Sequence, residues 1–277
     1  MLWTIVLVWL PASWAAIDWR LPWLILASFL AGVLNAVAGG GSFLSFPAML
    51  SIGLGPIQAN ATNTVALWPG QLTSIAGFRD EVRKHRKLAI KMACAGMVGG
   101  SVGAIILLVT PAMTFLHLVP WLLLFAALIF AASGPITKVI QRRSGGGEQV
   151  DPEAESNRNY WPLVLATMVV CFYIGYFGAG AGFLIISLLS LFGFQDLNEM
   201  NAMKVVSTTM ANGMACILFA FSGKVEWRYC LAAMVTCGIG GYLSARISQR
   251  ANPQFLRVLV VTIGLGMAAY FFWRNHA

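Results

Sequence analysis

Two glycine-rich stretches decide the fold: NAVAGGGSFLSFP at residues 35–47 and YFGAGAGFLIIS at residues 176–187. Each lies inside a long apolar run. Glycine weakens a helix and permits unusual backbone dihedral angles, so we expect both runs to break there. A break leaves free N–H groups and a helix N-terminus, which favour an anion. The alternative interpretation is close helix packing, because small residues let helices approach one another.

The composition places these runs in a membrane. Hydrophobic residues make up 58% of the 277 residues, charged residues only 10%, and the mean hydropathy is +0.76. A soluble chain averages about 25% charged residues. An ordinary cytosolic enzyme and a disordered chain are therefore excluded. The sequence predicts an all-α polytopic membrane protein whose surroundings are a lipid bilayer.

A helix needs about 20 apolar residues to cross the hydrocarbon core. The first sixteen residues are apolar but shorter, and form either a signal-peptide core without a positive leader or an interfacial segment. Residues 141–160 are polar and glycine-rich, and we expect a linker there. The resulting division is an apolar segment at 1–20, a first transmembrane repeat at 21–140, the linker at 141–160 and a second repeat at 161–277. Candidate spans are residues 21–50, 57–78, 88–109, 117–140, 162–192, 201–221, 228–248 and 255–273.

The two halves repeat with an offset of 141 residues. Internal repeats of this kind are typical of secondary transporters, which bind substrate between the repeats near the midplane. The matching residues are Gly39 and Gly41 with Gly180 and Gly182, Asn60-Ala61 with Asn201-Ala202, and Gly99-Gly100 with Gly240-Gly241.

The orientation of the repeats follows from how the glycine-containing runs cross. If each run crosses once, the halves are parallel; if each is a re-entrant hairpin, the halves are inverted. We favour the inverted arrangement, because Arg246, Arg250 and Arg257 then become cytoplasmic. The basic loop at 79–91 and the linker region at 138–160 are expected in the cytoplasm, and the membrane is expected to be the inner cell membrane. Since the basic residues lie between apolar runs and not on one face, the net charge of +8 does not indicate nucleic-acid binding.

Polar side chains line the second helix of each half. Steps of three, four or seven residues keep them on one helical face, which must turn towards the interior or a cavity. The alternative role is interhelical hydrogen bonding. The expected substrate-binding residues, with those of the glycine stretches, are Gly39, Gly40, Gly41, Ser42, Asn60, Asn63, Thr64, Gln71, Gly180, Gly182, Asn201, Lys204, Thr208 and Asn212.

Lys204 is the most informative of these residues. An ionisable residue inside a membrane indicates function by default, although a lysine can also snorkel to the headgroups, here beside Glu199 or Asp196. Facing a cavity, Lys204 would select an anion. No acidic residue lies deep within a span, which argues against cation transport and a carboxylate proton relay.

The chain resembles the TauE/SafE family, the sulfite exporters and sulfonate permeases. The resemblance rests on N-x-x-x-G-G-G, G-P-I-x-A-N-A-T-N-T, the second-half G-x-G-x-G and S-G-K-V-E-W, in this order. It implies a two-repeat permease for sulfur-containing anions such as sulfite or a sulfoacetate-like organosulfonate. Carried over by position, the family's regions are residues 39–42, 60–64, 178–182 and 201–208.

The predicted function is therefore a secondary transporter of a small anion, working by alternating access, with a proton or sodium ion as a candidate coupling ion. The alternatives are an anion channel and a carrier of a non-sulfur organic anion. We expect no enzymatic activity, no cofactor and no metal, because none of the histidines shares a short spacing with Cys, Asp or Glu in the apolar core and no phosphate-binding loop is present.

Overall fold

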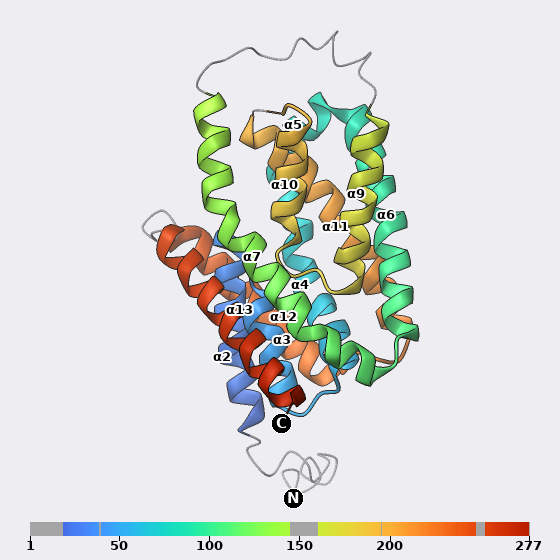
Figure 1. Cartoon of the computed structure of the whole chain (residues 1–277), viewed down its shortest axis with the longest axis vertical. Coiled ribbons are helices and arrows are strands. Elements are labelled where there is room, and N and C mark those ends of the chain that lie inside the picture. Colours follow the sequence, from blue (N-terminus) through green and yellow to red (C-terminus); the bar gives the residue numbers. More distant parts are fainter. Residues whose placement is uncertain (1–18, 39, 145–159, 195, 248–252, 277) are drawn as a thin grey trace, which may run out of the picture.

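A computed structural model describes residues 19–38, 40–144, 160–194, 196–247 and 253–276 (Figure 1). The described residues form helices joined by turns, with no strand among them. The helices are α2 (Arg20–Ala38), α3 (Ser42–Ser51), α4 (Pro56–Gly77), α5 (Arg79–Lys84), α6 (Arg86–Val109), α7 (Ala112–Ser144), α9 (Trp161–Tyr176), α10 (Ala181–Leu191), α11 (Leu197–Phe221), α12 (Trp227–Ile247) and α13 (Pro253–His276).

The helix starts follow the 141-residue spacing of the sequence. The helices α2, α4, α6 and α7 begin at residues 20, 56, 86 and 112, and α9, α11, α12 and α13 begin at residues 161, 197, 227 and 253. Each start in the second series thus lies 141 residues after its counterpart. The short helix α5 lies in the basic loop, where the sequence did not predict a helix.

The long apolar runs at 21–50 and 162–192 are each two helices that fold back on one another. The Trp23 indole at the start of α2 donates a hydrogen bond of 3.0 Å to Ser51 Oγ at the end of α3. In the second half, the rings of Tyr160, just before α9, and Phe194, just after α10, have centroids 6.2 Å apart. The two ends of each run therefore meet.

The second helix of each run ends in the same way. The N–H groups of Gly53 and Leu54 bond to the carbonyls of Leu50 and Met49, and the N–H groups of Gly193 and Phe194 bond to those of Ser190 and Leu189. Gly53 (φ +98°) and Gly193 (φ +90°) take the left-handed conformation that this helix end requires.

Close contacts at glycines join helices of the first half to helices of the second half. A methyl group added at Gly175 in α9 would lie 2.8 Å from the carbonyl carbon of Gly100 in α6. A methyl group added at Gly240 in α12 would lie 3.0 Å from that of Phe29 in α2. Helix α6 of the first half thus packs on α9 of the second, and α12 of the second half packs on α2 of the first, at backbone distance.

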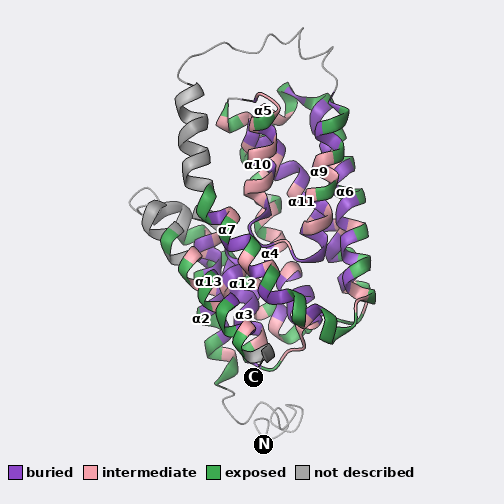
Figure 2. Ribbon diagram, viewed as in Figure 1, coloured by how far each residue is buried: buried purple, intermediate pink, exposed green. Residues whose placement is uncertain are grey.

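The outer surface of the molecule is apolar, as lipid contact requires. Figure 2 shows buried residues between the helices and exposed residues on their outer sides. On α6 these exposed residues include Val98, Val102 and Ile105. Among the described helices, the segments long and apolar enough to cross a membrane are Arg86–Val109, Ala112–Ala132 and Leu197–Phe221. The four helices of the two folded-back runs contribute shorter apolar segments, of 10–17 residues.

Candidate functional site

The first glycine stretch leads into α3 and contacts α4. Gly41 is buried, and an added methyl group would lie 2.5 Å from the carbonyl oxygen of Ala31 in α2. One turn later, the Ser45 hydroxyl lies 2.5 Å from Asn63 Oδ1 of α4 and 3.1 Å from the Gly41 carbonyl oxygen. Ser45 and Asn63 are both buried. In the first half, therefore, the amide oxygen of Asn63 already accepts a hydrogen bond from the Ser45 hydroxyl.

The second glycine stretch leads into α10. Gly178 (φ +78°) and Gly180 (φ +72°) are left-handed, and Gly180 is the N-cap of α10. The Tyr173 hydroxyl donates a hydrogen bond of 2.8 Å to the carbonyl of Ala179, which fixes the turn. The first turn of a helix has backbone N–H groups without intrahelical partners.

Lys204 lies across the start of α10. Its Cδ atom is 3.3 Å from the position that a β-carbon on Gly182 would occupy. Its ammonium group donates a hydrogen bond of 2.8 Å to Asn201 Oδ1, and the Asn201 side-chain amide donates one of 2.8 Å to the Leu197 carbonyl. Because Gly182 has no side chain, the lysine stem can pack directly on the helix.

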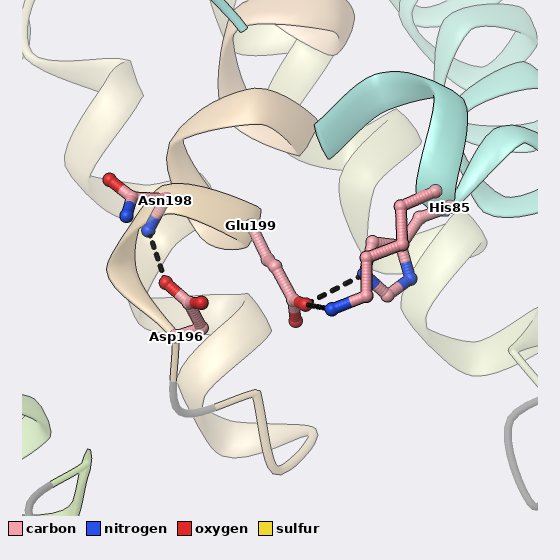
Figure 3. Close-up of polar contacts among 5 residues, drawn as sticks. His85, Asp196, Asn198 and Glu199 are labelled. Atoms are coloured by element: carbon pink, nitrogen blue, oxygen red, sulfur yellow. Dashed lines mark hydrogen bonds and ion pairs between the residues drawn. The ribbon is translucent and has the colours of Figure 1, made fainter. Parts of the chain in front are cut away.

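The acidic residues near Lys204 are engaged elsewhere, as Figure 3 shows for Asp196 and Glu199. Asp196 caps α11 by accepting a 2.7 Å hydrogen bond from the Asn198 N–H. Glu199 Oε1 lies 2.5 Å from Lys84 Nζ and 2.9 Å from His85 Nε2. Among the described residues no carboxylate forms an ion pair with Lys204, so the expected alternative pairing with Glu199 or Asp196 is wrong.

The polar stripes of α4 and α11 meet where these helices cross. Asn212 Nδ2 donates a hydrogen bond of 2.9 Å to Gln71 Oε1, and the Trp68 indole N–H donates one of 3.1 Å to the Thr209 carbonyl. In both pairs the partners are 141 residues apart. The crossing therefore joins equivalent positions of the two halves.

The two glycine stretches lie near one another. Asn60 Nδ2 on α4 donates a hydrogen bond of 3.1 Å to the carbonyl of Tyr176, the last residue of α9. The Phe46 ring on α3 meets the Phe177 ring of the second stretch with a centroid distance of 5.3 Å. Phe130 of α7 contacts Phe43 and Phe183, one from each stretch, with centroids 6.0 and 4.9 Å away.

The remaining expected residues have local roles. Gly40 is buried and accepts the Phe43 N–H, and Ser42 is the half-buried first residue of α3. The hydroxyls of Thr64 and Thr208 bond to carbonyls of their own helices, at Asn60 and Lys204. Gly39 lies outside the described residues.

Sequence reasoning missed several contacts of the site: those of Ser45, Trp68, Thr209 and His85. Ser45 stands in the quoted stretch, four residues after Gly41, so helical spacing alone could have placed it beside that glycine. The other contacts join helices of different halves, which no local pattern reveals.

Comparison with known proteins agrees with this architecture. The model of the family described as sulfite exporter TauE/SafE matches residues 24–271. A probable membrane transporter protein, ORF9, of a Sinorhizobium species is 26% identical and covers 90% of each chain. The probable membrane transporter protein YfcA of Escherichia coli K12 is 26% identical over 91% of this chain and 90% of its own.

A probable membrane transporter protein of Haemophilus influenzae is 24% identical over 89% of this chain and 92% of its own. No solved structure matches the chain. Since the family model covers nearly the whole chain, and the helices have the length and apolar surface that a bilayer requires, this multi-pass membrane protein belongs to the sulfite exporter TauE/SafE family of transmembrane transporters.

Proposed function

We propose that the chain is a secondary transporter of a sulfur-containing anion, such as sulfite or a sulfoacetate-like organosulfonate. Transport proceeds by alternating access across the inner membrane, and the anion binds between two inverted repeats, residues 21–140 and 161–277. The observation that carries the anion site is Lys204, packed on Gly182 at the start of α10 without a carboxylate partner among the described residues.

Contacts between α4 and α11 support the inverted repeat. A residue that touches its own equivalent lies at a two-fold axis, as Gln71 and Asn212 do. Along α4 from Thr64 to Gln71, the contacts on α11 move back from Cys216 to Thr209. The helices therefore run antiparallel through the crossing, and a two-fold axis that relates antiparallel helices is perpendicular to them. Such an axis lies in the membrane plane, which is the symmetry of an inverted repeat.

The folded-back runs support a site at mid-depth. In each pair, α2–α3 and α9–α10, the second helix, of 10 and 11 residues, has about half the length that a crossing needs, and glycines lie where the pair turns. We interpret both as re-entrant hairpins whose tips meet near the bilayer centre, where protein covers the broken backbone. The Phe46–Phe177 contact supports such a meeting of the tips.

The asymmetry of the halves supports an anion as substrate. The residue equivalent to Lys204 is Asn63, whose amide oxygen is already bonded to Ser45. The full positive charge therefore stands in the second half alone, over a helix N-terminus whose partial charge is also positive. One anionic group of the substrate, bound by Lys204, Asn201 and the start of α10, would neutralise both the lysine charge and the partial positive charge of the helix N-terminus. Gln71, Asn212, Asn60 and Thr208 provide further polar groups along the interface between the halves.

Orientation and coupling complete the proposal. The start of α9, which follows the linker, lies at the same end of the molecule as α5 (Figure 1). This supports placing loops 79–91 and 138–160 together in the cytoplasm. A proton or a sodium ion is the expected coupling ion.

The test is thermal unfolding of the purified protein with sulfite, thiosulfate, sulfoacetate, an aryl sulfonate, acetate and chloride. A ligand at 100 times its dissociation constant adds about 2.7 kcal/mol to stability. We expect a selective shift with one sulfur oxyanion, at least about tenfold weaker affinity in Lys204→Gln, and wild-type affinity in Lys224→Gln, an exposed cation remote from α10. Equal affinity in wild type and Lys204→Gln would remove Lys204 from the site, and saturable counterflow in vesicles would separate a carrier from a channel.

A further inference from the structure

The end of the molecule at α5 contains a charged cluster that the anion site does not use. We call Lys84, His85 and Glu199 the Glu199 cluster. The Glu199 side chain is 15% exposed, and its Oε1 atom contacts both Lys84 Nζ and His85 Nε2 (Figure 3). The His85 side chain is only 5% exposed. Because the carboxylate and the imidazole are largely shielded from water, salt screens their contact less than it screens an exposed surface pair.

The cluster joins the two halves. Lys84 ends α5 and His85 precedes α6, both in the first half, whereas Glu199 stands in the first turn of α11, in the second. In alternating access by rocking of one repeat against the other, contacts between the halves at each end must form in one state and break in the other. The Glu199 cluster is formed in this structure, so this end is in its closed arrangement.

The equivalent positions at the opposite end carry different chemistry. With the 141-residue offset, Glu199 corresponds to Gln58 and His85 to Glu226. Gln58 Oε1 accepts the N–H of Gly55 within its own half, and the halves are joined by the Glu226 backbone N–H, which donates a 3.0 Å hydrogen bond to Thr62 Oγ1. In this structure the ionic contact at the α5 end and the neutral contact at the opposite end are both formed, as in an occluded state between the two open ones.

We propose that the Glu199 cluster is the ionic gate contact of the α5 end, which closes the path to the anion site from that side. The inference rests on the proposed transport function and adds the gate to it. Glu199 is five residues before Lys204 on α11, about 7.5 Å along the helix axis. Opening the cluster frees the start of α11, where Asn201, the hydrogen-bond acceptor of Lys204, lies two residues after Glu199. The gate and the anion site therefore move on one helix.

The experiment measures access from each side without any ligand. Cys94, the exposed cysteine among the described ones, is replaced by serine, and Thr208→Cys supplies a half-buried reporter on α11. A membrane-impermeant thiol reagent is applied to right-side-out and inside-out membrane vesicles. Glu199→Gln, which keeps the shape of the side chain and removes its charge, is compared with the matched control Glu226→Gln, whose side chain is exposed at the other end.

We expect Glu199→Gln to raise labelling about fivefold from the α5 side and to lower it from the other side, because loss of about 1 kcal/mol of gate contact shifts the population between the two states. Glu226→Gln should label like wild type, and the charge exchange Lys84→Glu with Glu199→Lys should restore the wild-type rates.

Unchanged labelling from both sides in Glu199→Gln would overturn the gate. An equal rise from both sides would do so too, since it indicates loosening of the fold. Anion-dependent thermal shifts of the wild type and of Glu199→Gln, both with Thr208 intact because it is a proposed binding residue, test the transport proposal separately, since the labelling requires no anion.

Discussion

Replacement of Gly175 by alanine should destabilise the protein through the contact between α6 and α9. A β-carbon there would lie 2.8 Å from the Gly100 carbonyl carbon and 2.9 Å from its Cα, and closer still to its oxygen. These atoms are backbone, so no side chain can rotate away. The two helices must move apart until the β-carbon reaches an ordinary contact distance of 3.4–4 Å from these atoms. The same interface also includes Gly99 and Gly103.

The magnitude follows from two opposed terms. Overpacking of a well-packed interface costs about 1–3 kcal/mol, and alanine gains about 1 kcal/mol over glycine in a helix. Because three glycines of α6 contribute to the same interface, we place the cost at the upper end, with a net loss of about 2 kcal/mol and a fall of about 5 °C in Tm. The matched control is Gly238→Ala in α12, where an added methyl group would meet no atom within 4 Å.

The assay is thermal unfolding of the purified variants in one detergent, followed by intrinsic tryptophan fluorescence. Gly238→Ala should unfold at or slightly above the wild-type temperature, and Gly240→Ala, the equivalent contact of α12 with Phe29 of α2, should lose as much as Gly175→Ala. A Gly175→Ala protein as stable as Gly238→Ala would refute the close contact between α6 and α9.

Three further predictions concern the site. Gly41→Val should abolish vesicle transport while the protein still reaches the membrane, because its β-carbon would lie 2.5 Å from a backbone oxygen of α2; transport at the wild-type rate would contradict the role of the first glycine stretch. Ser45→Ala leaves the buried Asn63 oxygen without its hydroxyl partner and should cost about 1–3 kcal/mol in thermal unfolding, whereas Ser45→Thr should retain most of that stability. In a double-mutant cycle of Gln71→Ala and Asn212→Ala, the unfolding free energies should show a coupling of about 0.6 kcal/mol, typical of a hydrogen bond inside a membrane; additive effects would mean that the pair contributes nothing.

The sequence predicted the positions of the long helices because the repeat between the two halves can be seen directly along the chain. Matches such as Asn60-Ala61 with Asn201-Ala202 set the 141-residue offset, and the helix starts follow it. Apolar runs interrupted by glycine predict breaks, and in the structure α2 ends at Ala38 and α9 at Tyr176, each beside a glycine stretch. Neither signal depends on which helices become neighbours.

The partners of each helix could not be predicted in this way. Hydrophobic periodicity states which face of a helix is buried, and does not state what covers that face. The crossed packing of α6 on α9, and of Lys204 on Gly182 instead of on an acid, arises only when distant segments meet. The same limit hid the Glu199 cluster, because its members lie 114 and 115 residues apart and His85 reads as one more polar residue in a basic loop.

The differences between the halves carry more functional information than their likeness. Two identical inverted repeats would give a site and two gates that are the same from both sides of the membrane. Here the frame is symmetric at Gln71 and Asn212, where equivalent residues touch, and becomes asymmetric away from the axis. Lys204 stands where the first half has Asn63. Glu199 stands where the first half has Gln58, and His85 stands where the second half has Glu226. Both changes fall on or against α11, the helix that carries the proposed charge for the anion and the proposed gate. In the proposed mechanism these residues bind the anion mainly to one half and make the two ends open with unequal ease, so they set which state is more populated, whereas the gradients of the anion and of any coupling ion set the direction of net transport.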